Sequence, residues 1–285
     1  MSHYNNNGKK IVLVKLNFRP IYSLKDRYYN LKQEERSVVR HAFGKQSGEM
    51  GYSVDDVLEM YKKKPNADDV EAQYFIRQFA KAIRTWKIRK GKLERQLKER
   101  ERFRQALMRH AKEDGGKVLF DLRLEHGGIS CDIDAVLIMK NGIVPLMLRT
   151  PSGDSGVDDN GNFCWFDAET VSLEKVNIRH EQSVQKVLLT GILEDALDSR
   201  FGVYPAMIIG GGAPYNYKNR RDISFGSLEA MEKSISLDDM AVFDQPVIEL
   251  IEKAIKSARV KTPRQKIPFR SELIKAYWEV YMKML

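Results

Sequence analysis

Residues 131–150 constrain the fold of this chain more than any other segment. Two apolar runs of strand length flank Asn141-Gly142, a dipeptide that favours the tight turn of a β-hairpin. A turn centred on this dipeptide predicts an antiparallel pair of strands. The predicted pairs are Lys140 with Ile143, Ile138 with Pro145, Val136 with Met147, and Asp134 with Arg149.

Side chains alternate between the two faces of a strand, so this hairpin has one apolar face and one polar face. The predicted apolar face consists of Ile133, Ala135, Leu137, Met139, Val144, Leu146 and Leu148. The predicted polar face carries Asp132, Asp134, Met147 and Arg149. Two carboxylates and one guanidinium group are therefore expected close together on a sheet whose other face lies in a hydrophobic core.

The polar face resembles the metal site of the PD-(D/E)XK nuclease fold, in which an Asp ends one strand and an acid-x-Lys sequence lies on its hairpin partner. Over about residues 95–215 the chain is similar to the nuclease-related-domain (NERD) family. The matching segments are Val118–Leu124 for its first strand, Asp132–Asp134 for its EID strand, Gly142–Thr150 for its G-hydrophobic-IEVK strand, and then Ser152-Gly153, Trp165, Asn177 and Gln182. The resemblance implies an α/β fold with a PD-(D/E)XK nuclease-like central mixed sheet flanked by helices.

Two positions depart from the family pattern and place its catalytic activity in doubt. Met147 stands where the family has its second metal-binding Glu, and Arg149 stands where it has the catalytic Lys. A thioether is a poor ligand for Mg²⁺, and arginine holds its proton too tightly to act as a base. The resemblance therefore implies a nuclease-related protein with a degenerate active site, in which catalysis is impaired or lost.

An active enzyme remains an alternative, and it would be a nuclease that depends on Mg²⁺ or Mn²⁺. Asp134, with Asp132 or a migrated carboxylate, would bind the ion, and Arg149 would stabilise the charge that develops on the phosphate. Glu101 would supply the family's N-terminal acid. The acids that could replace the missing Glu are Asp154, Asp158, Asp159 and Glu169. The plainest alternative is a cross-strand ion pair between Asp134 and Arg149, worth a few tenths to about 1 kcal/mol.

A dense run of basic residues precedes the nuclease-like segment. Between Lys81 and Arg104 the chain has eleven lysines and arginines and only three glutamates. With a net charge of +9, this run favours a polyanionic partner, and nucleic acid in particular, because several phosphates can be neutralised together. The predicted nucleic-acid-binding residues are Arg84, Lys87, Arg89, Lys90, Lys92 and Arg95. The alternative is a solvated or coiled-coil face.

The chain is expected to have three regions. Residues 1–94 form a mostly helical N-terminal region that contains the long basic helix, residues 95–215 form the nuclease-related core, and residues 216–285 form a helical C-terminal extension. These helical extensions are candidate sites for a protein partner or for homo-oligomerisation. A protein-binding scaffold without affinity for nucleic acid is therefore a further alternative, in which the resemblance reflects fold ancestry alone.

Periodicity predicts the individual elements of these regions. In the long helix, which extends to about residue 112, an apolar stripe recurs at three- and four-residue steps through Val70, Tyr74, Phe75, Phe79, Ile83 and Trp86. Strands are expected over 11–17, 117–124, 131–139, 143–149, 162–166 and 204–209, a loop over 151–162, and further helices over 179–199, after Pro246, and over 271–284. Residues 1–10 are expected to be a disordered leader.

Composition excludes several other classes of protein. A hydrophobic content of 42% is enough for a core, but no apolar run is long enough to predict a membrane span. The two cysteines form no CxxC pair and argue against a disulfide framework, so we expect a cytoplasmic protein. Phosphate-binding glycine loops and serine-nucleophile motifs are absent from the sequence as well.

Overall fold

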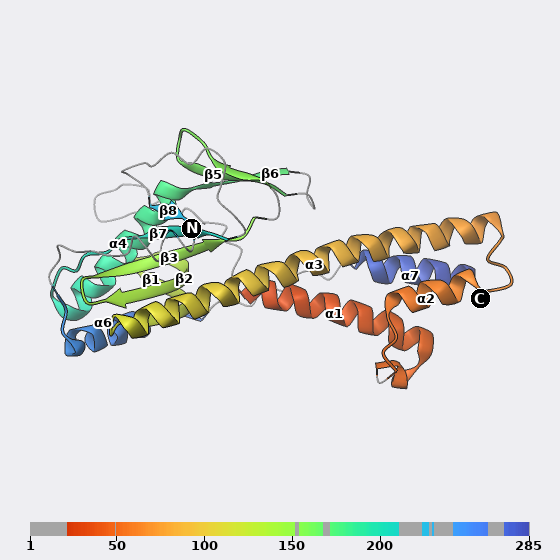
Figure 1. Cartoon of the computed structure of the whole chain (residues 1–285), viewed down its shortest axis with the longest axis horizontal. Helices are drawn as coiled ribbons and strands as arrows, with labels where there is room; N and C mark the ends of the chain where they lie inside the picture. The colour runs from red at the N-terminus through yellow and green to blue at the C-terminus, as the bar shows by residue number, and fades with distance from the viewer. Residues whose placement is uncertain are drawn as a thin grey trace. The chain divides into compact units, whose positions relative to one another are not determined.

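The computed structural model describes residues 22–48, 50–151, 154–167, 172–210, 224–227, 230, 242–261 and 271–284. Four sequence predictions lie outside these residues: the leader over 1–10, the strand over 11–17, Ser152-Gly153 and Glu169. The chain divides into two compact units, which are drawn in Figure 1. We call Tyr22–Lys98 with Arg264–Leu285 the helical unit, and Met1–Ile21 with Glu99–Pro263 the α/β unit. Helix α3 (Val70–Glu113) contributes residues to both.

The helical unit contains α1 (Tyr22–Phe43), the short 3-10 helix η1 (Lys45–Gly48), α2 (Val54–Lys62), the first part of α3, and α7 (Glu272–Lys283). Serines begin two of these helices. Ser53 and Asp56 form a capping box before α2, and the Ser271 side chain accepts a hydrogen bond from the Ile274 N–H at the start of α7. The core of the unit includes Val38, Val57, Tyr61, Phe79, Ile83, Trp86, Tyr277 and Val280.

The predicted apolar stripe of α3 is buried only in part. Phe79, Ile83 and Trp86 lie in the core, but Val70 and Tyr74 are 83% and 56% exposed. In the first turns of α3 the core instead receives Ala72 and Ile76, which lie on the same side of the helix as Phe79. The prediction for Val70 and Tyr74 is therefore wrong, because it took large side chains as the buried ones and left out a small alanine.

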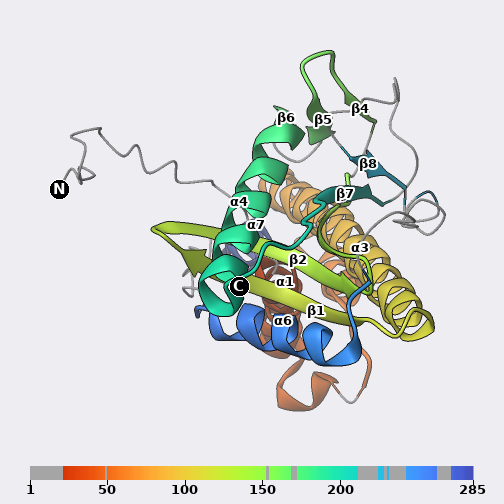
Figure 2. The same ribbon diagram turned by 90° about the vertical axis from the view of Figure 1, so that its left-hand side faces the viewer.

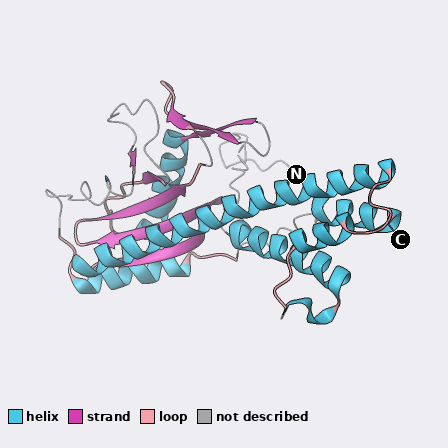
Figure 3. Ribbon diagram, turned by 45° about the vertical axis from the view of Figure 1, so that its right-hand side comes forward, coloured by secondary structure: helices cyan, strands magenta, loops and turns pink. Residues whose placement is uncertain are grey.

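The α/β unit contains a five-stranded mixed sheet in the order β1-β2-β3-β7-β8. Strands β1 (Lys117–His126), β2 (Ile129–Met139) and β3 (Gly142–Arg149) are antiparallel, whereas β7 (Ala206–Ile209) is parallel to β3 and β8 (Phe225–Gly226) is parallel to β7. A second, antiparallel sheet consists of β4 (Ser155–Val157), β5 (Asn162–Asp167) and β6 (Ser172–Asn177). Figure 3 shows both sheets in magenta. The predicted α/β class is confirmed.

Helices cover both faces of the five-stranded sheet, as Figure 2 shows. On one face, Phe103, Leu107 and Ala111 of α3 pack on residues of β2 and β3. On the other face, α4 (Ile178–Leu197) and α6 (Gln245–Ser257) pack on the sheet through Leu188, Leu189, Ile192, Ile248, Ile251 and Ile255. The helix expected over 179–199 and the helix expected after Pro246 are therefore both present, and the expected loop over 151–162 contains the short strand β4.

The hairpin of β2 and β3 forms as predicted, but its register differs from the prediction by two residues. Met139 pairs with Gly142, so the turn residues are Lys140 and Asn141. Within this described turn no residue has a positive φ, so the chain does not adopt the left-handed conformation that Asn-Gly favours. A shift of two residues does not by itself move a side chain to the other face, because side chains alternate with a period of two.

The alternation along β2 breaks at Asp134. Ala135 packs toward α3 as predicted, but Ile133 packs in the core beneath α4 and α6. At the same level of β1, Asp121 has a φ of 54°, a left-handed conformation that is uncommon for a residue other than glycine. The regular ladder pairs Phe120 with Ala135 and Leu122 with Ile133, on either side of these two aspartates. The predicted face of Ile133 is therefore wrong, because local backbone geometry overrides the simple alternation.

The two compact units do not follow the three expected regions. The division falls after Lys98, inside α3, rather than at residue 94. Helix α6 belongs to the α/β unit and α7 belongs to the helical unit, although both lie in the expected C-terminal extension of 216–285. The boundaries of the three regions stay a prediction.

Candidate functional site

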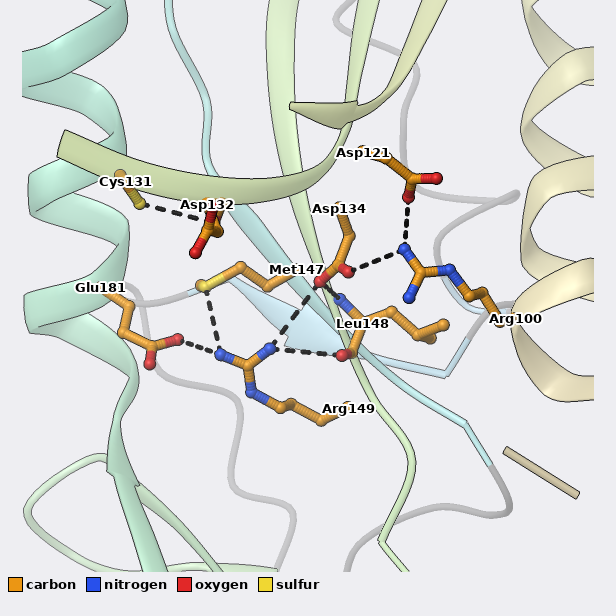
Figure 4. Close-up of polar contacts among 9 residues, drawn as sticks. All are labelled: Arg100, Asp121, Cys131, Asp132, Asp134, Met147, Leu148, Arg149 and Glu181. Atoms are coloured by element: carbon orange, nitrogen blue, oxygen red, sulfur yellow. Dashed lines mark hydrogen bonds and ion pairs between the residues drawn. The ribbon is translucent and has the colours of Figure 1, made fainter. Parts of the chain in front are cut away.

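Asp134 lies at the centre of a polar cluster between the helix layers of the α/β unit (Figure 4). It is only 8% exposed, and its Oδ2 accepts a hydrogen bond from the Leu148 N–H at 2.8 Å. Two guanidinium groups approach the same carboxylate. Arg100 Nη2 lies 3.5 Å from Oδ1, and Arg149 Nη1 lies 3.8 Å from Oδ2. The carboxylate is thus surrounded by donors from α3 and from β3.

Arg149 connects Asp134 to a second buried carboxylate. Its Nη2 lies 2.7 Å from Oε2 of Glu181, a buried residue in the first turn of α4. The same nitrogen lies 4.0 Å from the Met147 sulfur, and Nη1 donates to the Leu148 carbonyl oxygen at 3.3 Å. The guanidinium group therefore lies between a carboxylate from the sheet and a carboxylate from a helix.

On the side of α3, Asp121 extends the same cluster. Arg100 Nη2 pairs with Asp121 Oδ1, and Arg104 Nη1 lies 2.9 Å from Asp121 Oδ2. The Arg104 guanidinium also lies over the Phe120 ring, 4.5 Å from its centroid. These contacts hold the carboxylate of the one residue in β1 whose backbone is left-handed.

Together these groups form a chain of alternating charge, which we call the ion-pair network. Its members, in order of contact, are Arg104, Asp121, Arg100, Asp134, Arg149 and Glu181. Three cations balance three anions, so the network as a whole is neutral. Buried charges cost desolvation free energy that only good pairing can offset, and each member here has such a partner. The arrangement is suited to joining α3, the sheet and α4.

Burial raises the pKa of two acids in the network, Asp134 and Glu181. It raises the pKa of Asp134, and the neighbouring guanidinium groups of Arg149 and Arg100 oppose this rise. Burial likewise raises the pKa of Glu181, again against the attraction of Arg149. Burial also raises the pKa of the Cys131 thiol, to about 12, which favours the protonated thiol over the nucleophilic thiolate at neutral pH.

The two predicted metal ligands contact different partners. Asp132 binds Arg123, whose Nη1 lies 3.1 and 3.3 Å from its two carboxylate oxygens, whereas Asp134 belongs to the ion-pair network. Among the residues that the structure describes, no three His, Cys, Asp or Glu side chains gather in a way that could hold a metal ion. The carboxylates in the described part of the chain therefore do not fit a Mg²⁺ or Mn²⁺ site.

Two of the other predicted acids, Glu101 and Asp158, have partners outside the network. Glu101 is exposed on α3 and accepts a hydrogen bond from Gln105 Nε2 at 3.2 Å. Asp158 accepts hydrogen bonds from the backbone N–H groups of Asn160 and Asn162 within its own turn. The hydrogen bond from the Asn162 N–H is the main cause that lowers its pKa to about 2. Asp158 also pairs with Lys175, whose Nζ lies 3.1 Å from its Oδ2.

Acidic residues of the helical unit already pair with part of the predicted nucleic-acid surface. Lys87 Nζ lies 2.6 Å from Asp55 of α2, and Lys90 Nζ lies 3.4 Å from Glu35 of α1. Arg89 is partly buried, and its charge acts on the buried Glu34. Lys92 is also partly buried, whereas Arg84 and Arg95 are exposed. The structure thus separates the predicted set into exposed cations and cations that support the helix packing.

Exposed cations of α3, including Arg84 and Arg95, lie together on the side of the helix that faces away from the core of the helical unit. We call this group the basic face, and it consists of Arg77, Lys81, Arg84, Arg95 and Lys98, all exposed. Their spacing is part of a repeat of three and four residues that also includes Ile88 and Gly91, so all seven positions share one side of the helix. No acidic residue occupies any of these positions.

Sequence reasoning missed four members of the network, Arg100, Arg104, Asp121 and Glu181. A usable signal existed for Arg100, because it precedes Phe103, Leu107 and Ala111 at helical spacing and so lies on their buried side. For Glu181 the signal was its position between Asn177 and Gln182, two residues that match the nuclease-related-domain pattern. For Asp121 the sequence carries no comparable signal, since its left-handed backbone cannot be inferred from its neighbours.

Comparison with known proteins adds no assignment. No family model matches the chain, and no curated protein or solved structure matches it. Membership of the nuclease-related-domain family therefore stays a prediction. Within the described residues, no helix combines the length and the apolar character needed to cross a membrane.

Proposed function

We propose that this protein binds nucleic acid through the basic face of α3, and that its α/β unit is a nuclease-related domain that no longer cleaves. The basic face is the observation that supports binding of nucleic acid. Five cations on one side of one helix, with no acid among them, create the positive potential that a phosphate backbone requires.

The order of elements supports the nuclease-related half of the proposal. Helix α3 precedes three antiparallel strands, and α4 then leads to β7, which is parallel to β3. A helix, a hairpin-rich sheet, a helix and a further strand are the sequence of elements that the resemblance implies. Asp134 and Arg149 lie at the positions of that resemblance, on neighbouring strands.

The ion-pair network supports the loss of cleavage. The Arg149 guanidinium contacts both Asp134 and Glu181, so the carboxylate oxygens that would bind a metal ion already have a cation. Arginine is too weak an acid to supply a base in its neutral form, and Met147 adds no oxygen ligand. The site therefore has neither the ligands nor the base of a metal-dependent nuclease.

Binding is tested by fluorescence anisotropy with labelled oligonucleotides at increasing salt concentration. We expect affinity to fall linearly on a logarithmic scale, and the double variant Arg84→Ala/Arg95→Ala to reduce the slope by about two. The matched control, Lys62→Ala/Lys275→Ala, removes two cations that are paired with Glu59 and Glu279 outside the basic face. Equal effects of the two double variants, or no binding at low salt, would favour the protein-binding scaffold.

Loss of cleavage is tested with plasmid and single-stranded DNA in Mg²⁺ and in Mn²⁺. We expect no products from the wild-type protein. Cleavage that requires the metal and disappears in Asp134→Ala, with circular dichroism showing a folded variant, would restore the enzyme alternative. Cleavage that persists in Asp134→Ala would instead point to a contaminating nuclease.

A further inference from the structure

Two exposed apolar side chains lie on the same side of α3 as the basic face: Tyr74 at its N-terminal end and Ile88 within it. Tyr74 and Ile88 are both exposed, Ile88 by 61%, and both lie on the outer side of α3. Tyr74 precedes Arg77 by three residues and Lys81 by seven, and Ile88 follows Arg84 by four residues. Residues three or four positions apart are neighbours on a helix surface, so Tyr74 lies beside Arg77 and Ile88 lies beside Arg84.

This combination matches the chemistry of an unpaired nucleotide strand. Cations bind the phosphates, while an aromatic ring can stack on a base that has left its duplex. A duplex keeps its bases stacked inside and presents mainly phosphates and groove edges, for which an exposed tyrosine and isoleucine have little use. An apolar group beside a phosphate-binding cation thus favours a single strand over a duplex.

We infer that the basic face binds single-stranded nucleic acid, with Tyr74 stacking on an unpaired base. This inference rests on the proposed function and names the form of its ligand. The distance available is sufficient for several nucleotides, because the segment from Tyr74 to Lys98 extends for about 36 Å along the helix axis at about 1.5 Å per residue.

Packing beneath Tyr74 restrains its ring. The Tyr74 and Phe75 rings meet edge to face, with centroids 5.3 Å apart and an interplanar angle of 84°. Phe75 in turn packs against the core of the helical unit, and Lys283 lies over its ring. A ring whose position is restrained in this way loses less conformational entropy when a base stacks on it.

The experiment compares anisotropy titrations of the full chain with oligothymidylate, oligouridylate and a DNA duplex. We expect Tyr74→Ala to weaken binding of the single strands by roughly 5- to 100-fold, as expected for loss of one stacked base, and to leave duplex binding unchanged. Tyr74→Phe keeps the ring and should retain the affinity. Tyr29 is 59% exposed on α1 and outside the basic face, so Tyr29→Ala is the matched control and should have no effect.

The possible outcomes separate this inference from the proposed function. Wild-type binding that Tyr74→Ala leaves unchanged, or weakens equally for single strands and duplex, overturns the inference and leaves the proposed function in place. An equal effect of Tyr29→Ala also overturns it. If the wild-type protein binds none of the three probes at low salt, both the proposed function and the inference fail. A difference between oligothymidylate and oligouridylate would distinguish DNA from RNA as the preferred strand.

Discussion

At the scale of single residues, Arg149 connects two buried carboxylates of the candidate site. Its guanidinium group contacts Asp134 from the sheet and Glu181 from α4, and both carboxylates are buried. Removal of one partner from a buried ion pair leaves an uncompensated charge, whereas an exposed ion pair contributes little. A substitution of Arg149 should therefore reduce the stability of the fold much more than the removal of an exposed arginine would.

Arg149→Met should lower the free energy of unfolding by about 3–5 kcal/mol, because two buried carboxylates lose their shared cation. The measurement is urea unfolding followed by circular dichroism. The control is Arg200→Ala, which breaks a pair with Glu194 where the arginine side chain is 92% exposed, and it should cost less than about 1 kcal/mol. Similar losses in both variants would show that Arg149 is not a member of a buried network.

The raised pKa values of Asp134 and Glu181 predict a dependence of stability on pH. Ordinary values are 3.8 for Asp and 4.5 for Glu, and both groups have a higher pKa in the folded protein. The folded state then binds more protons than the unfolded state, so the contribution of these groups is favourable below the ordinary values. It is lost as pH rises from there through the folded values.

Asp134→Asn/Glu181→Gln should therefore weaken the fall in stability as pH rises from about 4 toward neutrality. Urea unfolding of the double variant and the wild type at a series of pH values measures this difference. The expected result is a shallower slope in the variant over that window. An unchanged or steeper slope would mean that burial does not raise the pKa of these carboxylates.

At the scale of elements, glycines mark where backbone segments come close together. A Cβ at Gly116, just before β1, would meet the carbonyl oxygen of Ile138 in β2. This backbone oxygen belongs to the ladder between β1 and β2, so it cannot move without disturbing the pairing of Lys117 with Ile138. In contrast, a Cβ at Gly91 in the middle of α3 would meet nothing within 4 Å.

These two glycines predict opposite effects of the same substitution. Gly116→Ala should destabilise the protein by about 1–3 kcal/mol, because added volume strains a packed backbone. Gly91→Ala should stabilise it by about 0.5–1 kcal/mol, because alanine favours the helix more than glycine does. Thermal unfolding of both variants measures the two shifts. A destabilising Gly91→Ala would indicate that α3 is not continuous through this position.

Much of the fold at this scale could be predicted from the sequence, and the reasons for the failures are specific. Periodicity located the strands of the 131–150 hairpin and the helix α4, because each has a regular repeat of its own. The register could not be predicted, since it depends on the φ values at Lys140 and Asn141. The side of Ile133 could not be predicted either, because the alternation of β2 breaks at Asp134, opposite the left-handed Asp121 of another strand.

The candidate site was predicted only on its sheet side. Asp134 and Arg149 were both identified, because alternation and the hairpin turn place them on one face. Their partners Arg100 and Glu181 come from helices distant in the sequence, and only packing brings them to the sheet. Local patterns describe a residue's own element, whereas an ion-pair network is a property of several elements together.

At the scale of the whole molecule, the positive charge is distributed unevenly. The chain has a net charge of +9, but the ion-pair network of the α/β unit is neutral. In addition, Lys87 and Lys90 of α3 pair with acids of α2 and α1. The basic face in the helical unit is an exception, since its positions include no acid. A polyanion should therefore act on one unit more than on the other.

Nucleic acid should stabilise the helical unit more than the α/β unit. A ligand that binds only the folded state at 100 times its Kd adds about 2.7 kcal/mol to stability. Hydrogen exchange with and without an oligonucleotide at low salt should show added protection in α3 before residue 98, and high salt should remove it. Equal protection of both units, or protection that persists in Arg84→Ala/Arg95→Ala, would contradict this expectation.

The ion-pair network also bears on whether the folding of the α/β unit depends on a metal ion. A site that binds a metal ion completes its charge balance only after an ion has been acquired, so folding depends on what the surroundings supply. Here the cations that balance Asp134 and Glu181 are side chains of the same polypeptide. The chain thus supplies these counter-ions itself, and the charge balance of the network does not depend on an ion acquired from the cell.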